Sequence, residues 1–360
     1  MTEMRVLHLI PSLGGGGAER QIGYLARGLA ERGGDVHVGI LRGGANLERL
    51  ERTGATVHWI RASGNYDPFL LPRTVSLIRR VRPDVVQTWL TQMDVVGGLA
   101  ALIAGRRWIV SERSSGAHYP RDARHAMRRL IGRFADAIVA NSKGGLSFWT
   151  KTKATKFVVP NAVPLEEIDA APREEIDVGD AKVILYAGRL DEEKNLPNLI
   201  DALAEAMRDR DAVALFCGEG PLEASVRARI EQRGLSGRVR ILGFTDRLWG
   251  LMKRADVLVA VSWFEGHPNV VLEAAAAGCP LVVSDIAAHR DVLGDEAAAF
   301  VPPSDAGAIA AAIGQSLDDP ATGRERARRA RDTVAAFSIP AAAESYLRVY
   351  DPADASIDRH

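Results

Sequence analysis

The stretch Ser262-Trp-Phe-Glu-Gly-His-Pro-Asn-Val-Val-Leu-Glu273 places two carboxylates, Glu265 and Glu273, eight positions apart. The apolar, β-branched run before it, residues 255–261, is typical of a short buried strand of a parallel sheet. Residues 270–278, after it, predict a helix that ends at a glycine. The two carboxylates are therefore expected to lie on either side of a strand-to-helix junction.

This junction is expected to bind an anion. Asn269 is predicted to be the N-cap of the helix, and the N–H groups of Val270, Val271 and Leu272 then have no partner within the helix. Glu265 would lie at the carboxyl end of the strand, where open α/β sheets bind ligands, and Glu273 on the first helical turn. An anion site flanked by two carboxylates that can bind hydroxyl groups suits a sugar nucleotide.

A second loop of the same half carries compact positive charge. Tyr186-Ala-Gly-Arg-Leu-Asp-Glu-Glu-Lys-Asn195 places Arg189 and Lys194 between a predicted strand and a predicted helix. A diphosphate needs such cations, a guanidinium fork and an ammonium point charge. In isolation the two cations would be interpreted as solvated charges of a surface loop. The loop is, however, predicted to lie on the same sheet edge as the Glu265 loop, which favours a role in binding.

Two further turns of this half are candidates for the nucleotide pocket. Gly218 follows one predicted strand, and Phe244 and Thr245 follow the next. These residues would line the nucleotide or face its base. Ordinary turn chemistry explains the same residues equally well.

The order of patterns predicts an α/β protein of two doubly wound domains. Strand-like runs alternate with helix-length segments over residues 1–163, and the alternation restarts at residue 182. Pro160-Asn-Ala-Val-Pro164 discourages regular structure and marks a hinge. We expect an N-terminal domain at 1–163 and a C-terminal domain at 164–337, with a last helix at about 338–352 packing back onto the first.

The zero net charge of the 360 residues hides a strong asymmetry. Residues 1–163 hold 24 Lys and Arg against 12 Asp and Glu, whereas the remainder holds 22 against 34. The basic half is expected to meet an anionic partner such as lipid headgroups. Two cysteines in apolar runs indicate a reducing compartment, and no run has the ~20 apolar residues of a membrane span. The chain is expected to be cytoplasmic, peripheral to a membrane at most.

A glycine run, residues 14–17, joins the first predicted strand to the first helix. Gly16 and Gly17 allow backbone N–H groups to approach a phosphate closely. The dinucleotide-binding fingerprint is not met, because Glu19 replaces its third glycine and Arg42 replaces its acidic residue. Since an arginine can accept a 2′-phosphate, an NADP-dependent oxidoreductase remains an alternative.

The loop Ser111-Glu-Arg-Ser-Ser-Gly-Ala-His-Tyr119 gathers polar groups after a predicted strand. Its Glu112, Arg113 and His118 are candidates for contact with a second substrate, although such groups can also be simply exposed. The following segment is cationic, and its arginines 121, 124 and 128 share one helical face. A solvated face is the ordinary explanation, and contact with anionic lipid or a lipid-linked diphosphate is the alternative.

Together these residues resemble glycosyltransferase family 4, the retaining sugar transferases of the GT-B fold, over nearly the whole chain. The most specific part is the E-x7-E motif from Glu265 to Glu273, followed by the Arg189–Lys194 loop. The resemblance implies two Rossmann-like domains facing across a cleft. It implies that Glu265 contacts the donor sugar and Glu273 the ribose. It also implies that Arg189 and Lys194 neutralise the leaving diphosphate, with Gly16 and Gly17 closing over it.

The resemblance also implies the reaction. A hexose or N-acetylhexosamine would pass from a nucleoside-diphosphate sugar, UDP-linked, to a glycan or lipid-linked acceptor in surface-polysaccharide assembly. Neither a metal nor a cofactor is implied, and no nucleic-acid partner is expected. The chain departs from the family where many relatives carry a histidine after the fifth strand, because Glu112 and Arg113 stand there. The acceptor side is thus where it differs most.

Besides the oxidoreductase, three alternatives stay open at this point. Two are GT-B enzymes, one that acts on a small-molecule acceptor and one that epimerises a nucleotide sugar, which needs no acceptor. A sugar-nucleotide-binding regulator would have the fold without turnover. The regulator is disfavoured because Glu265, Glu273, Arg189 and Lys194 are all present.

Overall fold

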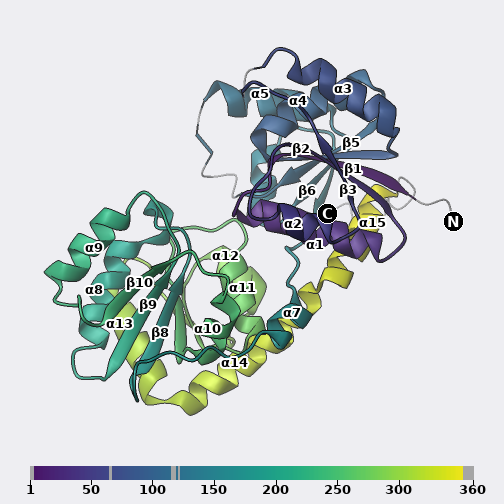
Figure 1. Ribbon diagram of the computed structural model, residues 1–360. Coiled ribbons are helices and arrows are strands. Elements are labelled where there is room, and N and C mark those ends of the chain that lie inside the picture. The colour runs from purple at the N-terminus through teal and green to yellow at the C-terminus, as the bar shows by residue number, and fades with distance from the viewer. Residues whose placement is uncertain (1–3, 65–66, 115–118, 121, 352–360) are drawn as a thin grey trace. The chain divides into compact units, whose positions relative to one another are not determined.

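The computed structural model describes residues 4–64, 67–114, 119–120 and 122–351. The chain forms two compact units, Met1–Ala162 with Phe337–His360, and Val163–Ala336. Each unit is a parallel β-sheet with helices on both faces (Figure 1). The fold is therefore α/β with two Rossmann-like units, as the sequence predicted.

The first unit is built on a seven-stranded sheet of order β3-β2-β1-β4-β5-β6-β7. The strand order reverses between the neighbours β1 and β4, which is the topological switch point of this sheet. Its strands are β1 (Arg5–Ser12), β2 (Asp35–Arg42), β3 (Thr56–Trp59), β4 (Val85–Trp89), β5 (Arg107–Glu112), β6 (Ala137–Ala140) and β7 (Thr155–Val158).

Both faces of this sheet are buried, which explains the continuous apolar runs of its strands. In β1, Val6 and Ile10 pack on one face and Leu7 and Leu9 on the other. The first face is covered by α1 (Gly17–Ala30), α2 (Leu47–Glu51) and α15 (Ile339–Tyr350). The second face is covered by α3 (Leu70–Val81), α4 (Leu90–Ile103), α5 (Ala123–Ile131), and the turns η2 (Gly132–Phe134) and η3 (Ser147–Trp149). The short helix α6 (Lys143–Leu146) follows β6.

The C-terminal helix α15 is part of this first unit. The Arg107 side chain donates to the carbonyls of Val349 and Tyr350 at 2.9 and 3.1 Å, at the end of the helix. The hydroxyl of Tyr350 donates to the side-chain oxygen of Gln87 in β4. These bonds cap the final carbonyls of α15 and fix it to the sheet.

The second unit has a six-stranded sheet of order β10-β9-β8-β11-β12-β13, with its switch point between β8 and β11. The strands are β8 (Lys182–Ala187), β9 (Ala212–Cys217), β10 (Val239–Gly243), β11 (Val257–Ala260), β12 (Leu281–Ser284) and β13 (Ala299–Val301). The helices are α7 (Leu165–Ala170), η4 (Glu192–Lys194), α8 (Leu196–Ala206), α9 (Glu223–Gln232), α10 (Leu248–Arg254), α11 (Asn269–Ala276), α12 (Ala287–Leu293), α13 (Ala306–Asp318) and α14 (Pro320–Val334); the turn η5 (Ala335–Phe337) leads on to α15.

Candidate functional site

Lys194 and Glu265 meet at the switch point of the second unit. Lys194 ends η4, which follows β8, and Glu265 lies in the loop after β11. The Lys194 ammonium lies 2.8 Å from Glu265 Oε1 and 3.2 Å from Glu193 Oε1. The two side chains that the sequence placed on one sheet edge are thus in direct contact, where the strand order reverses.

Only one of the two oxygens of the Glu265 carboxylate accepts hydrogen bonds from the described residues. Its Oε1 accepts from Lys194 and, at 2.7 Å, from the hydroxyl of Ser262. Its Oε2 has no hydrogen-bond partner among the residues that the structure describes, and the side chain keeps 16% of its surface exposed. One carboxylate oxygen is therefore available to accept from a hydroxyl group of a ligand.

Lys194 is held in its charged form. Burial lowers its pKa, but the carboxylates of Glu265 and Glu193 outweigh that effect and raise the pKa above its ordinary value. Nearby, burial and the charge of Glu193 raise the pKa of Asp191. A negatively charged ligand can therefore bind the Lys194 ammonium by taking the place of one of the carboxylates around it.

The loops that carry this pair are connected by Asn195, which the sequence analysis did not single out. Asn195 is 1% exposed and has a left-handed backbone, with φ of 56°. Its amide donates to the carbonyl of Val261 at 3.0 Å and to that of Pro303 at 2.6 Å. The only available signal was an asparagine before a helix, and such a residue tolerates the left-handed conformation.

A second missed group lies behind Ser262. The hydroxyl of Ser284 donates to the Ser262 carbonyl at 2.8 Å, and the His289 Nδ1 lies 2.9 Å from the Ser284 carbonyl. His289 is fully buried, and burial lowers its pKa, so the imidazole is neutral and donates from Nδ1. This chain of contacts fixes the backbone that presents Ser262 to Glu265.

Arg189 is placed differently from Lys194. Its side chain is 70% exposed, and its ion-pair partner within the described chain is Asp191, at 3.6 Å. Glycine is required nearby, because a Cβ on Gly218 would lie 2.0 Å from the Gly188 carbonyl oxygen. The loops after β8 and β9 are therefore in close contact, and Arg189 extends from them into solvent.

The helix after Glu265 differs from its prediction by one residue at its start. α11 begins at Asn269 with Pro268 at the N-cap position, so Asn269 is the first helical residue and not the cap. The N–H of Leu272 bonds the Pro268 carbonyl. Leu272 therefore does not offer the free N–H that the sequence predicted, and the Asn269 N–H bonds the His267 carbonyl at 3.0 Å, so the N–H groups of Val270 and Val271 remain as the candidates for anion binding. Gly278, at φ 73°, follows the helix end.

Glu273 lies one turn into α11 and is more enclosed than expected. It is 4% exposed, and its Oε2 accepts from the indole N–H of Trp249 at 3.0 Å. Phe244 is 69% exposed at the end of β10, and its N–H contacts Glu219 at 3.4 Å. The hydroxyl of Thr245 accepts from the Arg247 N–H at 3.2 Å. Among the described residues, no hydrogen bond or ion pair joins Phe244 or Thr245 to Lys194 or Glu265.

The glycine loop of the first unit carries its own carboxylate. Gly16 is the N-cap of α1, and Gly17 is the first helical residue. A Cβ on Gly16 would lie 2.3 Å from Glu19 Oε2, so this glycine makes room for Glu19 to fold back. The negative charge of the Glu19 carboxylate therefore already lies at this helix N-terminus. At the neighbouring strand end, Leu90 has φ of 68°, a strained conformation typical of functional sites.

Glu112 does not fit its predicted role as an acceptor contact. Its side chain is fully buried. Its Oε1 accepts from the Ser114 N–H and the Tyr119 hydroxyl. Its Oε2 accepts from Arg128 and from the Trp149 indole, each at 2.9 Å. Four donors occupy the carboxylate, so it stabilises the interior and has no oxygen left for a substrate.

Arg128 is likewise not part of a lipid-facing surface. Its side chain is 1% exposed and bonds Asp94 at 2.7 Å as well as Glu112. Helical spacing predicted one cationic face, but the ion pairs draw this arginine inward. Arg121 and His118, of the same prediction, lie outside the described residues.

Arg113 is engaged by the first unit itself. Its guanidinium stacks on Trp89, 4.3 Å from the ring centroid, and donates to Asn161 at 3.0 Å and to the Tyr346 hydroxyl. Beside it, His8 is fully buried, and burial lowers its pKa to about 3. Arg113 thus connects β4, the end of the first unit and α15.

The structure also bears on metal binding. Within the described residues, no group of three or more His, Cys, Asp or Glu side chains is arranged to hold a metal ion. An Asp-x-Asp sequence occurs at Asp209-Arg210-Asp211. It directly precedes β9 and so lies at the opposite strand end from Lys194. No described helix is long and apolar enough to cross a membrane.

Comparison with known families agrees with this geometry. The model for Glycosyltransferase Family 4 matches residues 15–167, and the model for Glycosyl transferases group 1 matches residues 168–333. The two models follow each other and leave only the chain ends unmatched. The chain belongs to glycosyltransferase family 4.

Individual relatives of this glycosyltransferase span most of its length. An N-acetylgalactosamine-N,N′-diacetylbacillosaminyl-diphospho-undecaprenol 4-alpha-N-acetylgalactosaminyltransferase of Campylobacter jejuni is 29% identical over 80% of this chain and 82% of its own. The lipopolysaccharide core biosynthesis glycosyltransferase LpsE of Rhizobium meliloti is 29% identical over 93% of this chain and 95% of its own.

A solved structure shares the fold of this glycosyltransferase. Anabaena HepE in complex with UDP and glucose has a TM-score of 0.85 at 21% identity, over 96% of this chain and 99% of its own. The fold of this glycosyltransferase is GT-B, as predicted.

Proposed function

We propose that this glycosyltransferase moves a hexose or N-acetylhexosamine from UDP to a glycan or lipid-linked acceptor in cell-surface polysaccharide assembly. The transfer would retain the anomeric configuration and need no metal ion. The observation that carries the proposal is the Lys194–Glu265 pair at the switch point of the second unit. Names of relatives support the substrate class, namely a lipid-diphosphate sugar transferase, a lipopolysaccharide core enzyme and a fold neighbour with UDP and glucose.

The pair supplies what breakage of the anomeric C–O bond requires. The leaving diphosphate gains negative charge, and a preorganised cation stabilises that charge in the transition state. In this proposal Lys194 fills that role with exposed Arg189, while the free Oε2 of Glu265 accepts from a sugar hydroxyl. Glu273 would bind the ribose. The acceptor attacks the face that the diphosphate leaves, and the diphosphate takes up the acceptor proton.

Binding of nucleotides tests the donor class directly. A ligand that binds the folded state raises the apparent melting temperature. Among UDP, GDP and ADP, UDP should therefore give the largest rise if the donor is a UDP-sugar. Lys194→Ala should weaken UDP binding at least about tenfold, since the charge-assisted contact is lost. Lys182→Ala is the matched control, because Lys182 begins β8 at the far end of the strand and pairs with Asp256 at 3.3 Å. Equal loss in both variants would refute the assignment.

Two product measurements test the mechanism. The ¹H coupling of the new anomeric centre should match an α-linkage when the donor is an α-linked UDP-sugar. The transfer rate should be unchanged by EDTA. A β-linked product or loss of activity on chelation contradicts the retaining or the metal-independent part, respectively.

We further propose that the first unit rests on an anionic membrane. Large apolar side chains are exposed on α4 and on α5 with η2, two neighbouring segments, and they are Leu102, Ile103, Met127, Leu130 and Phe134. Arg124, Arg129 and Arg133 are exposed among them. Apolar side chains bordered by arginines are typical of surfaces that insert into the headgroup region.

Vesicle co-sedimentation tests this surface. Binding to phosphatidylglycerol vesicles should fall with salt and should be weakened by Phe134→Ala. Phe244→Ala is the control, because Phe244 is 69% exposed and Phe134 66%, and Phe244 belongs to the second unit. Equal effects of the two substitutions, or binding that ignores salt, would contradict the proposal.

A further inference from the structure

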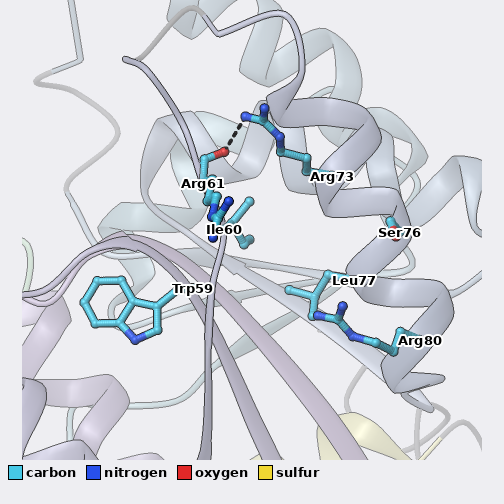
Figure 2. A pocket seen from close by; sticks show the side chains of 7 residues that line it. All are labelled: Trp59, Ile60, Arg61, Arg73, Ser76, Leu77 and Arg80. Atoms are coloured by element: carbon cyan, nitrogen blue, oxygen red, sulfur yellow. Dashed lines mark hydrogen bonds between the residues drawn. The ribbon is translucent and has the colours of Figure 1, made fainter.

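A pocket lies at the edge of the first unit, away from every residue assigned above. It has a volume of about 280 Å³ and is formed between the end of β3 and helix α3. Figure 2 shows Ile60 and Arg61 on one side, and Arg73, Ser76, Leu77 and Arg80 along α3 on the other, with Trp59 nearby. We call it the β3–α3 pocket.

The α3 side of the pocket follows from helical spacing. Arg73, Ser76, Leu77 and Arg80 recur at intervals of three and four residues and so form one stripe along the helix. Leu77 and Ile60 are 3% and 5% exposed and form an apolar floor. The pocket thus combines a small apolar floor with three guanidinium groups at its rim.

Two of the three positive charges at this rim have no counter-charge among the described residues. Residues 61–82 contain five arginines and a single acidic residue, Asp67. Asp67 pairs with Arg73 at 3.0 Å and accepts from the N–H groups of Ser63 and Phe69 at 2.8 Å each. Neither Arg61 nor Arg80 has a side-chain ion pair within the described part of the chain. Two like charges without a counter-charge favour an anion between them.

One of the three arginines is preorganised. Arg73 donates to the Arg61 carbonyl at 2.8 Å, the dashed contact in Figure 2, and its guanidinium lies 5.4 Å from the Phe69 ring centroid. Its bond to Arg61 ties the segment after β3 to α3, which fixes the width of the pocket. Trp59, 58% exposed, adds an indole beside it, a group that can pack against a sugar ring.

We propose that the β3–α3 pocket binds an oxyanion, a phosphate or carboxylate, that the acceptor carries away from its reacting hydroxyl. This inference rests on the proposed function, because it takes the acceptor to be a glycan or a lipid-linked glycan, the class of molecule that carries such a group. The pocket follows the carboxyl end of β3, so it shares a sheet edge with the ends of β1 and β4. Three strand spacings separate β3 from β4, roughly 14 Å, a span that a short oligosaccharide or a lipid headgroup can bridge.

Fluorescence of Trp59 reports occupancy without any need for turnover. We would titrate the full chain with D-glucuronate, glucose 6-phosphate and neutral D-glucose, and subtract the response of a Trp59→Phe variant. The two anions should change the Trp59 signal, and glucose should not. Arg61→Ala and Arg80→Ala should each weaken anion binding about tenfold, as expected when a charged hydrogen bond is lost.

Arg79→Ala is the matched control, because Arg79 neighbours Arg80 on α3, is exposed and does not line the pocket. Its affinity for the anions should stay within about twofold of the parent, as for other exposed charges. A loss in Arg79→Ala equal to that in Arg80→Ala would show a diffuse field and overturn the proposal. Equal binding of glucose and glucuronate would also overturn it.

Vesicles of phosphatidylglycerol with phosphatidylcholine identify the source of the anion. Selective loss of vesicle binding in Arg80→Ala, against Arg79→Ala, assigns the pocket to a lipid headgroup phosphate, and selective loss of glucuronate or glucose 6-phosphate binding assigns it to a glycan. Insensitivity of both arms to Arg80→Ala overturns the proposal. UDP binding should be unchanged in these variants. A parent chain without UDP binding would contradict the proposed function while leaving the anion measurement interpretable.

Discussion

Glu265 and Glu112 invite comparison, because each lies at or just after the carboxyl end of a sheet strand and each forms an ion pair with a cation. Glu265 keeps one oxygen free beside Lys194, and its side chain is 16% exposed. Glu112 has both oxygens occupied by four donors, and its side chain is fully buried beside Arg128. Similar residues thus serve different ends, and the number of unused acceptor positions distinguishes a binding carboxylate from a structural one.

The largest expected effect is on the structural side of this comparison. Arg128→Met leaves Asp94 and Glu112 buried without their cation, and loss of one partner of a buried ion pair costs about 3–5 kcal/mol. Urea unfolding should show this loss in the free energy of unfolding. UDP binding by the second unit should persist under native conditions.

Arg124→Met is its control, since Arg124 lies on the same helix but its side chain is 70% exposed. We expect a change within about 0.5 kcal/mol, as at most surface sites. A similar destabilisation by both substitutions would mean that the buried charges are not what holds α5 in place.

Glu265→Gln should have the opposite effect to Arg128→Met, because it should reduce activity and leave stability unchanged. The transfer rate should fall about 10²- to 10³-fold, the usual cost of removing one preorganised polar group from an active site. The free energy of unfolding should hardly change. The rate can be followed as UDP release from UDP-sugar in the presence of a membrane extract that supplies acceptors. Glu223→Gln, at an exposed ion pair with Arg227 in the same unit, should be neutral. Full transfer activity in Glu265→Gln would remove the central assignment.

These two substitutions also show what the sequence could predict. Spacing placed Glu265 and Lys194 correctly, because strand ends in a parallel sheet share one edge and short loops leave little choice of position. The strand predicted at residues 255–261 is present as β11, with bounds shifted by at most two residues, because its apolar run is buried.

The same reasoning could not predict that the Arg128 side chain is buried in ion pairs. Helical periodicity shows which residues share a face but not which partner lies opposite, and Asp94 and Glu112 are 34 and 16 residues away in sequence. Asn195 was missed likewise, because its contacts are with the carbonyl groups of Val261 and Pro303 in distant loops. Long-range polar contacts leave no periodic signal in the chain.

The pH dependence of stability separates the two regions further. Burial raises the pKa of Asp94 from 3.8 to about 6. A carboxyl whose pKa is higher in the folded state stabilises the fold most when protonated, and this contribution is lost as the pH rises through 6. Acidification from pH 7.5 to 5 should therefore stabilise the parent by about 1 kcal/mol relative to Asp94→Asn, which does not titrate.

Urea unfolding of both proteins at each pH gives the difference, so that other titrating groups cancel. A difference that does not vary between pH 7.5 and 5 would show that Asp94 stays ionised in the folded state. UDP affinity should not differ between parent and Asp94→Asn at any of these pH values, since Asp94 belongs to the first unit.

The smallest effect is expected from Ser262→Ala, which removes the 2.7 Å hydrogen bond to Glu265 Oε1. Loss of one such bond is worth about 1 kcal/mol, so the transfer rate should fall roughly fivefold while UDP affinity is kept. Ser316→Ala, which removes a 2.8 Å bond to the Ala312 carbonyl on α13, should leave the rate unchanged. If Ser262 acts only by orienting Glu265, its substitution should have no further effect in a Glu265→Gln background. An additive loss in the double variant would instead mean that Ser262 contacts the substrate itself.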